Sequence, residues 1–352
     1  MPRKPITIVP ACILLVLVWL LPAPVGAGET ADGVLELAAV QFAVDERTYA
    51  DMKAFEKRVR RLVESAADAG AELVVFPEYI NVFLLFSEYD GVIRDSDTVE
   101  EAMHRIAEQE GLPAASLPRL LTREIAEGVS GIQRLWARLA REEQVTIVAG
   151  SAFVQAASEP ERSGTSSASD SSHGGAGAAT GGSIRNRALV FGPDGELIAR
   201  QDKRYLTPFE MEEAGMGRGR ITEADTFRVD GFDVALTICR DSYFSAWEQR
   251  FAHADLWLDI RANGEPYGPQ VRERFEGALP ERVARTPVPA GVSTSLTGSF
   301  LDFLWQGPAF VVDAEGRRVA ESPSPRGTEV LLVSVEKNGD LNVKSTNEVQ
   351  NR

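Results

Sequence analysis

The stretch that most constrains the fold, residues 231–244, joins a strand to a helix through a cysteine. Apolar residues alternate with smaller or polar ones up to Ile238, which is the period of a half-buried strand. Cys239 follows directly, and aromatic residues then recur at helical spacing from Phe244 to Phe251. A thiol at such a turn lies near helix N–H groups, which favour a thiolate. A buried structural cysteine would show the same pattern, because free cysteines are among the most buried residues.

Two other stretches carry groups that a reactive thiol needs. Residues 71–78 read as a buried strand that ends in Glu78, and Lys203 precedes a Leu-x-Pro-Phe sequence. Taken singly, the glutamate fits a solvated turn and the lysine fits a solvated basic edge. The order Glu78, Lys203, Cys239, at strand ends or adjoining loops, resembles the nitrilase superfamily of carbon-nitrogen hydrolases over residues 35–336. Cys-Arg-Asp around the thiol is closer to the amidase-like branch than the Cys-Trp-Glu of nitrile-converting members.

The resemblance implies an α/β fold, the four-layer α-β-β-α sandwich of the nitrilase/carbon-nitrogen hydrolase type. It also implies a catalytic triad in which Cys239 is the nucleophile, Glu78 the base and Lys203 the cation. Such a triad meets the needs of amide hydrolysis, which are a nucleophile, a base and a donor for the oxyanion. A carboxylate at the end of a buried strand has its pKa raised by desolvation, which suits Glu78 to proton transfer. Lys203 would stabilise both the thiolate and the oxyanion.

Further site residues follow with less support from the pattern. Family members usually place a second glutamate eight residues after the lysine, whereas Glu210 comes seven after it, with Glu212 and Glu213 as alternatives. Three more residues are predicted to contact the substrate: Arg240, Tyr205 and Asn263. The backbone N–H of Arg240 is predicted to be the second oxyanion donor. Asn186 fits the family's Asn-x-Ala strand ahead of the lysine.

Cysteine and histidine counts exclude other mechanisms. The chain has two cysteines, and Cys12 lies in the apolar leader, so the mature protein would hold Cys239 alone. The three histidines are His104, His173 and His253, the last placed by its spacing on the helix after the cysteine. None lies at a strand end or in a motif, so a papain-like pair and a zinc site are both disfavoured. No metal and no cofactor is predicted.

The N-terminus has the pattern of a signal peptide. Arg3 and Lys4 precede an apolar run over residues 11–21, and small residues end at Ala27. Residues 1–27 are therefore predicted to be removed, and residues 28–352 to form an exported carbon-nitrogen hydrolase domain, secreted or periplasmic. An uncleaved N-terminal anchor is the alternative. The net charge of −15 argues against nucleic acid and anionic membranes as partners.

The rest of the chain predicts one domain of alternating strands and helices. Residues 79–131 look like an insertion after Glu78 that forms either a lid or wall of the substrate pocket or extra packing at its rim. Residues 156–182, rich in Ser, Gly and Ala, are predicted to be a disordered surface loop. Strands are predicted at 35–44, 73–76, 145–153, 184–191, 196–201, 254–260, 288–295, 308–312 and 330–335, and helices at 51–70, 132–139 and 270–285.

These observations predict an exported, thiol-dependent hydrolase of a small non-peptide amide, acting through a thioester on Cys239. Two alternatives stay open. In an N-acyltransferase an amine rather than water would take the acyl group, and in a non-catalytic binding protein the fold would be kept without the chemistry. The predicted partner is a small-molecule amide, and the resemblance also allows a homo-oligomer.

Overall fold

The computed structural model describes residues 33–112, 117–156 and 183–346. The predicted signal peptide 1–27 and nearly all of the predicted loop 156–182 lie outside the described residues. Within the described ranges, no helix is both long and apolar enough to cross a membrane.

In the part of the chain that the structure describes, fourteen strands form one continuous sheet whose central strand is β1 (Val34–Val44). On one side β1 pairs in parallel with β2 (Leu73–Val75), and on the other with β9 (Ala290–Phe300). Beyond β2 come β3 (Thr146–Gln155), β4 (Ile184–Phe191) and β5 (Leu197–Asp202), and beyond β9 come β8 (Leu256–Ala262), β7 (Phe232–Ile238) and β6 (Phe227–Val229). The remaining strands flank β1 and β9: β10 (Phe303–Trp305), β11 (Phe310–Asp313), β12 (Arg318–Glu321), β13 (Glu329–Glu336) and β14 (Leu341–Thr346).

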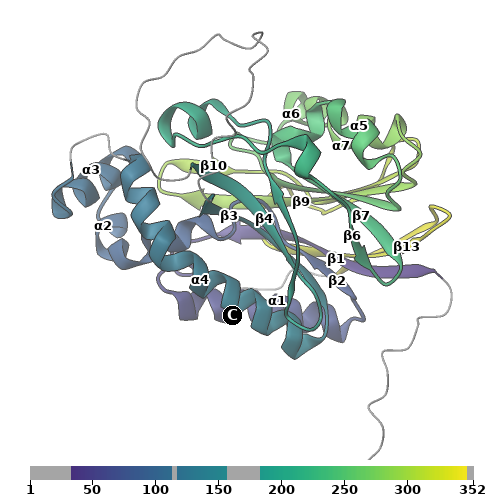
Figure 1. Ribbon diagram of the computed structural model, residues 1–352, viewed down its shortest axis with the longest axis horizontal. Helices are drawn as coiled ribbons and strands as arrows, with labels where there is room; N and C mark the ends of the chain where they lie inside the picture. The colour runs from purple at the N-terminus through teal and green to yellow at the C-terminus, as the bar shows by residue number, and fades with distance from the viewer. Residues whose placement is uncertain (1–32, 113–116, 157–182, 347–352) are drawn as a thin grey trace, which may run out of the picture. The chain divides into compact units, whose positions relative to one another are not determined.

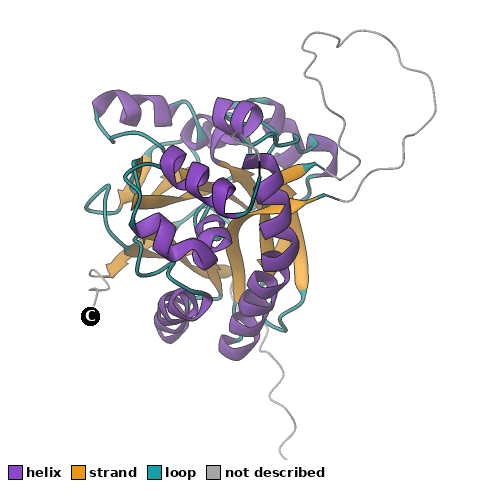
Figure 2. Cartoon of the chain, turned by 90° about the vertical axis from the view of Figure 1, so that its left-hand side faces the viewer, coloured by secondary structure: helices purple, strands orange, loops and turns teal. Residues whose placement is uncertain are grey.

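The two halves of this sheet pack face to face between outer helices, as Figures 1 and 2 show. Successive side chains of a strand point to opposite faces, so β1 serves two cores. Leu35 and Leu37 face the opposite half-sheet, whereas Val40 and Phe42 face the helices. The helices α1 (Met52–Asp68) and α4 (Leu117–Glu143) cover this half, and α5 (Ala246–Phe251), α6 (Pro269–Glu276) and α7 (Leu279–Ala284) cover the other. Three hydrophobic clusters therefore separate four layers, and the predicted α-β-β-α sandwich is confirmed.

Where the structure describes it, the region 79–131 is mainly helical and includes the first half of α4. It contains the 3-10 helix η1 (Val82–Tyr89), α2 (Asp90–Arg94), α3 (Val99–Gln109) and the first half of α4. The helix predicted over 132–139 is therefore only part of α4, because buried Leu121 and Ile125 extend the same apolar stripe toward the N-terminus.

The single helix predicted over 270–285 is wrong, because the structure has two helices there. The break falls at Gly277 and Ala278, between α6 and α7. Glycine is a poor helix former, and Pro280 in the first turn of α7 has no N–H with which to continue α6.

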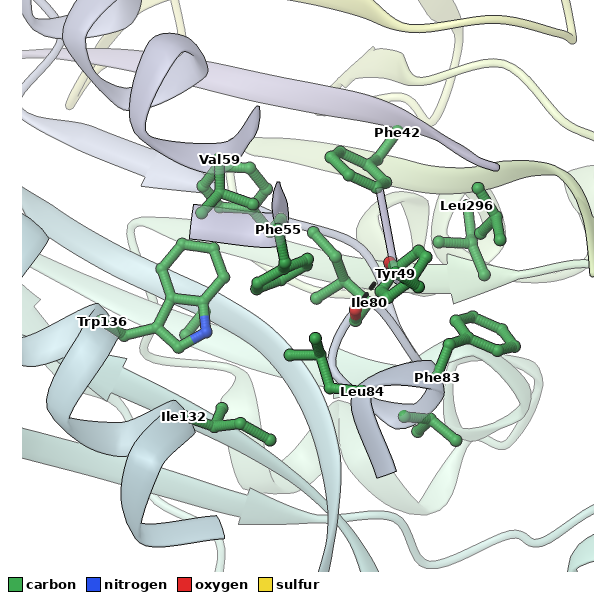
Figure 3. Packing of buried hydrophobic residues seen from close by; sticks show 14 of the residues in the cluster. Phe42, Tyr49, Phe55, Val59, Ile80, Phe83, Leu84, Ile132, Trp136 and Leu296 are labelled. Atoms are coloured by element: carbon green, nitrogen blue, oxygen red, sulfur yellow. Dashed lines mark hydrogen bonds between the residues drawn. The ribbon is translucent and has the colours of Figure 1, made fainter. Parts of the chain in front are cut away.

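The segment that follows Glu78 is anchored in the core (Figure 3). The Tyr49 hydroxyl donates to the Ile80 carbonyl over 2.7 Å, and the ring of Phe83 packs against Tyr49 at 5.1 Å. From α4, Trp136 donates its indole N–H to the Asn81 side chain over 2.8 Å. These contacts fix the position from which the region 79–131 leaves the sandwich.

Candidate active site

Three strand ends converge on one buried cluster. Glu78 comes three residues after β2, Lys203 directly after β5, and Cys239 directly after β7. Lys203 Nζ lies 2.7 Å from Glu78 Oε1. The charges of Glu78 and Lys203 both shift the pKa of the Cys239 thiol, which places the three groups in one electrostatic environment. The structure thus brings together the three residues that the sequence predicted as a triad.

Lys203 lies between two carboxylates, and all three side chains are buried. Glu210 Oε2 is 3.0 Å from Lys203 Nζ. The Asn186 amide bridges the two glutamates, donating to Glu78 Oε1 over 2.9 Å and to Glu210 Oε1 over 2.8 Å. Glu212 and Glu213 are exposed, so among the three candidate glutamates Glu210 is the one beside the lysine.

The two glutamates differ in their readiness to take a proton. Burial raises the pKa of Glu78 above its ordinary value, although Lys203 opposes that effect. Burial acts in the same direction on Glu210, but Lys203 and the backbone N–H of Thr207 outweigh it and lower the pKa. Carboxyls whose pKa values are pushed apart in this way are suited to different roles, one as a base and one as a fixed anion.

One carboxylate oxygen of this cluster has a distinctive position. Glu78 Oε2 is buried and accepts no hydrogen bond from any residue that the structure describes. Buried polar atoms are almost always paired, so an exception needs an explanation. A lone pair kept free for a proton in transit is one such explanation.

Cys239 has a positive φ of 50°, in the left-handed region that residues with a side chain rarely adopt. It opens η4, a 3-10 turn (Cys239–Tyr243), in which the Ser242 hydroxyl donates to the Cys239 carbonyl over 2.8 Å. Such strain persists only where the surroundings impose it, and it clusters at functional sites. The strand-to-helix turn thus presents the thiol in a fixed position.

The sequence-based expectation of a thiolate does not hold in this structure. Burial raises the pKa of Cys239 to about 12, with the neighbouring Glu78 as a further cause, and Lys203 opposes the rise only in part. The turn after the strand is a five-residue 3-10 helix rather than a long α-helix, so few aligned peptide dipoles act on the sulfur. The surroundings of the Cys239 sulfur therefore favour the neutral thiol over the thiolate.

Asp241, which the sequence placed in the Cys-Arg-Asp motif but not among the site residues, joins the cysteine turn to the lysine loop. Its carboxylate accepts the backbone N–H groups of Arg204 over 3.0 Å and of Tyr205 over 2.8 Å. These two residues directly follow Lys203, so Asp241 sets the position of the lysine relative to Cys239. Burial raises the pKa of Asp241 to about 8. Only its spacing two residues after the cysteine could have indicated this link.

Tyr79 is a second residue that the sequence reading missed as part of the cluster. It directly follows Glu78, and its φ of 63° is also in the left-handed region. Its hydroxyl makes a hydrogen bond to Glu210, and Lys203 Nζ lies 5.6 Å from the centre of its ring. Tyr79 therefore packs directly on the cluster.

A cavity of about 520 Å³ opens over this cluster, with Glu78 and Lys203 in its lining. Cys239 is not part of the lining. Its Sγ lies 4.0 Å from the carbonyl oxygen of Ala262, and Ala262 does line the cavity. A larger cavity of about 680 Å³, between the end of β1 and α1, contains none of the candidate residues. The chemistry therefore belongs to the smaller cavity.

The three predicted substrate contacts lie outside the lining of that cavity. Tyr205 stacks on Phe244 with ring centres 3.6 Å apart. Asn263 donates its amide hydrogens to two backbone carbonyls, one of them that of Gln306. The Arg240 side chain is exposed, which leaves its backbone N–H as the group near the sulfur. Packing and loop anchoring thus occupy the Tyr205 and Asn263 side chains.

The described histidines lie apart from the cluster. His253 follows the end of α5 at Phe251, so its predicted place on that helix is wrong, and its ring nitrogen lies 3.3 Å from the Thr226 hydroxyl. His104 is largely exposed beside Glu108. Within the described part of the chain, no group of three or more His, Cys, Asp or Glu side chains is arranged to hold a metal ion.

Comparison with known proteins decides the family. A family model described as "Carbon-nitrogen hydrolase" matches residues 36–338. The chain belongs to the carbon-nitrogen hydrolase family. The predicted membership of the nitrilase superfamily is therefore confirmed, and the protein is an enzyme, a carbon-nitrogen hydrolase. No curated protein matches the sequence.

Solved structures of this carbon-nitrogen hydrolase fold are similar at low sequence identity. A carbon-nitrogen hydrolase from Helicobacter pylori G27 has a TM-score of 0.60 at 16% identity, covering 87% of this chain and 90% of that one. An acrylamide complex of a glutamate and cysteine double mutant of the amidase from Nesterenkonia sp. AN1 has a TM-score of 0.60 at 15% identity, covering 87% and 92%. A cysteine-to-serine mutant of the same amidase has a TM-score of 0.59 at 16% identity, covering 88% and 94%. At this identity the likeness supports the fold.

Proposed function

We propose that this carbon-nitrogen hydrolase is an amidase that cleaves a non-peptide amide through a thioester on Cys239. The observation that carries the proposal is the free Oε2 of Glu78, buried beside Lys203 in the environment of the thiol. A neutral thiol needs a base at the moment of attack, and Glu78 has a raised pKa and an open lone pair.

In the first half-reaction, Glu78 takes the proton of the Cys239 thiol while the sulfur attacks the amide carbon. The carbonyl oxygen becomes an oxyanion, which Lys203 Nζ and the backbone N–H of Arg240 stabilise. Donors fixed in advance are effective here because they do not have to reorganise as the charge develops. The C–N bond then breaks, Glu78 returns its proton to the leaving nitrogen, and the amine departs.

In the second half-reaction, water replaces the amine. Glu78 takes a proton from this water, the hydroxide attacks the thioester carbon, and the same donors stabilise the second oxyanion. When the C–S bond breaks, the carboxylic acid leaves and Cys239 regains the proton held on Glu78. Glu210 and Asn186 do not exchange protons in this scheme; they hold the lysine and Glu78 in position.

Solved structures of a similar amidase support this chemistry. A glutamate-to-glutamine mutant of the Nesterenkonia amidase shows covalent addition of the acetamide moiety of fluoroacetamide at its active site cysteine. We extend the thiol chemistry to Cys239 because this chain carries a glutamate, a lysine and a cysteine in one buried cluster.

The test is ammonia release from a panel of primary amides by the purified protein. Wild type should turn over at least one amide, Cys239→Ala should turn over none, and Glu78→Gln should be slower by roughly 100- to 10,000-fold, the usual contribution of a general base. Thermal melting checks that both variants fold. Amide turnover by folded Cys239→Ala would end the proposal.

We also propose that the enzyme acts outside the cytosol, on the basis of the signal-peptide pattern in residues 1–27. N-terminal sequencing of protein from the native host should find a chain that starts near Gly28. A cytosolic chain that keeps Met1 would refute export without touching the chemistry.

A further inference from the structure

The walls of the active-site cavity are apolar almost throughout. One wall comes from the helices that follow Glu78, with Val82 and Phe86 from η1 and Met103 from α3. The charged side chains of its lining are Glu78 and Lys203 of the catalytic cluster and two exposed carboxylates, Glu213 and Asp302. The cavity is thus a hydrophobic chamber with a polar floor.

The opposite wall is the β9–β10 hairpin, which contributes Phe300, Phe303 and Leu304. The two walls are fastened together. The Val99 N–H at the start of α3 donates to the Asp302 side chain over 2.8 Å, at the tip of the hairpin.

At one end of the chamber the walls touch, because the Phe83 ring lies 4.9 Å from Phe300 and 5.2 Å from Trp305. Figure 3 shows Phe83 beside Tyr49 among the buried hydrophobic residues. The chamber is therefore preformed and closed at that end.

The size of the chamber suits a large group. Its volume of about 520 Å³ lies in the range of pockets that enclose drug-sized ligands, roughly 300–1,000 Å³. An acyl group of one or two carbons would leave most of the apolar wall in contact with water. Transfer of apolar surface out of water drives binding roughly in proportion to the area buried, so a larger apolar group gains more.

We infer that the chamber selects amides whose acyl part is large, apolar and uncharged, either aromatic or branched aliphatic. This inference rests on the amidase function proposed above. The acyl part is assigned to the chamber because it alone stays on Cys239 through both half-reactions and must be held while water replaces the amine. Two exposed rim carboxylates, Glu213 and Asp302, disfavour an anionic substituent.

Four substrates test this inference: acetamide, 3-phenylpropanamide, N-phenethylacetamide and succinamate. Relative to 3-phenylpropanamide, acetamide lacks the apolar group, N-phenethylacetamide carries it on the amine side, and succinamate replaces it by a carboxylate. We expect kcat/KM for 3-phenylpropanamide to exceed that for acetamide by on the order of 100-fold or more, because each methylene in an apolar pocket changes the rate by about tenfold or more. A higher kcat/KM for acetamide, N-phenethylacetamide or succinamate than for 3-phenylpropanamide overturns the inference.

A matched pair of variants ties the preference to the chamber. Leu304→Asp puts a charge into the wall at a partly exposed position, and should lower the ratio of kcat/KM for 3-phenylpropanamide over acetamide by about tenfold or more. Val319→Asp puts the same charge on β12, where the side chain is 49% exposed, and should leave the ratio unchanged. An unchanged ratio in folded Leu304→Asp contradicts the assignment of the chamber.

Calorimetric binding to Cys239→Ala separates this inference from the proposed function. If 3-phenylpropanamide binds this variant more tightly than acetamide but wild type hydrolyses neither, the amidase proposal fails and the selectivity of the chamber stands. If wild type hydrolyses both amides equally well and Cys239→Ala binds both equally, the selectivity fails and the amidase proposal stands.

Discussion

At the scale of single residues, the site depends on Lys203 because it separates two buried carboxylates. Its ammonium lies 2.7 Å from Glu78 and 3.0 Å from Glu210, with all three side chains almost fully buried. The two anions hold the pKa of Lys203 above its ordinary value, although burial acts against them. In the proposed mechanism, the lysine therefore supports the folded state as well as the oxyanion.

Lys203→Ala should both inactivate and destabilise the enzyme. Removing one partner of a buried ion pair leaves uncompensated charge and typically costs about 3–5 kcal/mol. The double variant Lys203→Ala, Glu210→Gln removes one charge of each sign, so it should regain much of that stability while staying inactive. Urea unfolding and amide turnover measure the two effects. A double variant no more stable than Lys203→Ala would show that Glu210 is not the partner of the lysine.

The second prediction concerns Asp241 and pH. Its pKa in the folded protein is raised to about 8, mainly by burial, whereas an unfolded aspartate titrates near pH 4. A group with a raised folded pKa stabilises the fold fully below its unfolded pKa, and that stabilisation is lost as pH rises through the folded pKa. We therefore expect the melting temperature to fall between about pH 4 and pH 8, and to fall less in Asp241→Asn. Parallel pH curves for the two proteins would assign the loss to other groups.

The three residues of the proposed triad could be located from sequence, but their ionisation could not. Glu78, Lys203 and Cys239 each follow a strand in a recognisable motif. The neutral thiol depends on burial by segments far apart in the chain and on the nearby Glu78. No local pattern reports either effect, which is why the sequence alone predicted a shift in the opposite direction.

At the scale of elements, the turn after β2 is shaped by β3. Gly150 has a φ of +61°, and a Cβ at this position would lie 2.2 Å from the Pro77 carbonyl oxygen and 2.5 Å from the Ile80 side chain. Tyr79 is held to the same strand by a bond of 3.0 Å from its N–H to the Ser151 hydroxyl. The position of Glu78 therefore depends on a residue about seventy positions away.

Gly150→Ala should shift the Pro77–Glu78 backbone and lower both stability and kcat. Overpacking typically costs about 1–3 kcal/mol, and the left-handed φ adds to it. Gly70→Ala is the matched control, because Gly70 has a φ of +91° but nothing within 4 Å of the added carbon. It should lose some stability and keep full kcat. Equal effects of the two variants on kcat would show that the contact with Pro77 is unimportant.

Strong periodicity identified most elements, whereas helix boundaries depended on contacts that the sequence does not display. The alternation up to Ile238 predicted β7, which spans Phe232–Ile238. The first half of α4 was missed because its apolar stripe contains gaps and its packing partners, η1 and α1, are distant in sequence. Its side chains face the core only once those elements are in place.

At the scale of the whole molecule, the sandwich depends on β1, whose side chains alternate between the core under the helices and the core between the two half-sheets. The alternation of β1 predicted a strand, but its parallel pairing with β9, some 250 residues later, is a non-local contact. The family resemblance supplied the four layers, and the three hydrophobic clusters explain them. Substrate selectivity belongs to this scale too, because helices after β2 and the β9–β10 hairpin form the chamber together.

The connection between β3 and β4 should be dispensable to the sandwich. Gln155 and Ile184 are directly opposite in the antiparallel pair, and the Ala156 N–H donates to the Ser183 carbonyl over 3.1 Å. Replacing residues 157–182 with Asn-Gly, a favoured two-residue hairpin turn, should leave the melting temperature and kcat unchanged or slightly raise the former, since shorter loops cost less entropy. A clear fall in melting temperature would show that 157–182 contributes to the fold.

The central claim is that Cys239 carries the acyl group and that Glu78 moves the protons. The most direct measurement is intact-mass analysis of Glu78→Gln after exposure to p-nitrophenyl 3-phenylpropanoate. Nitrophenolate leaves without a proton from Glu78, so acylation should suffer less from the loss of the base than attack by water does, and the thioester should accumulate. We predict a mass gain of one acyl group that peptide mapping places on Cys239 and that hydroxylamine removes, with none in the double variant Glu78→Gln, Cys239→Ala. An acyl group on any other residue, or the same mass gain without Cys239, would contradict the account.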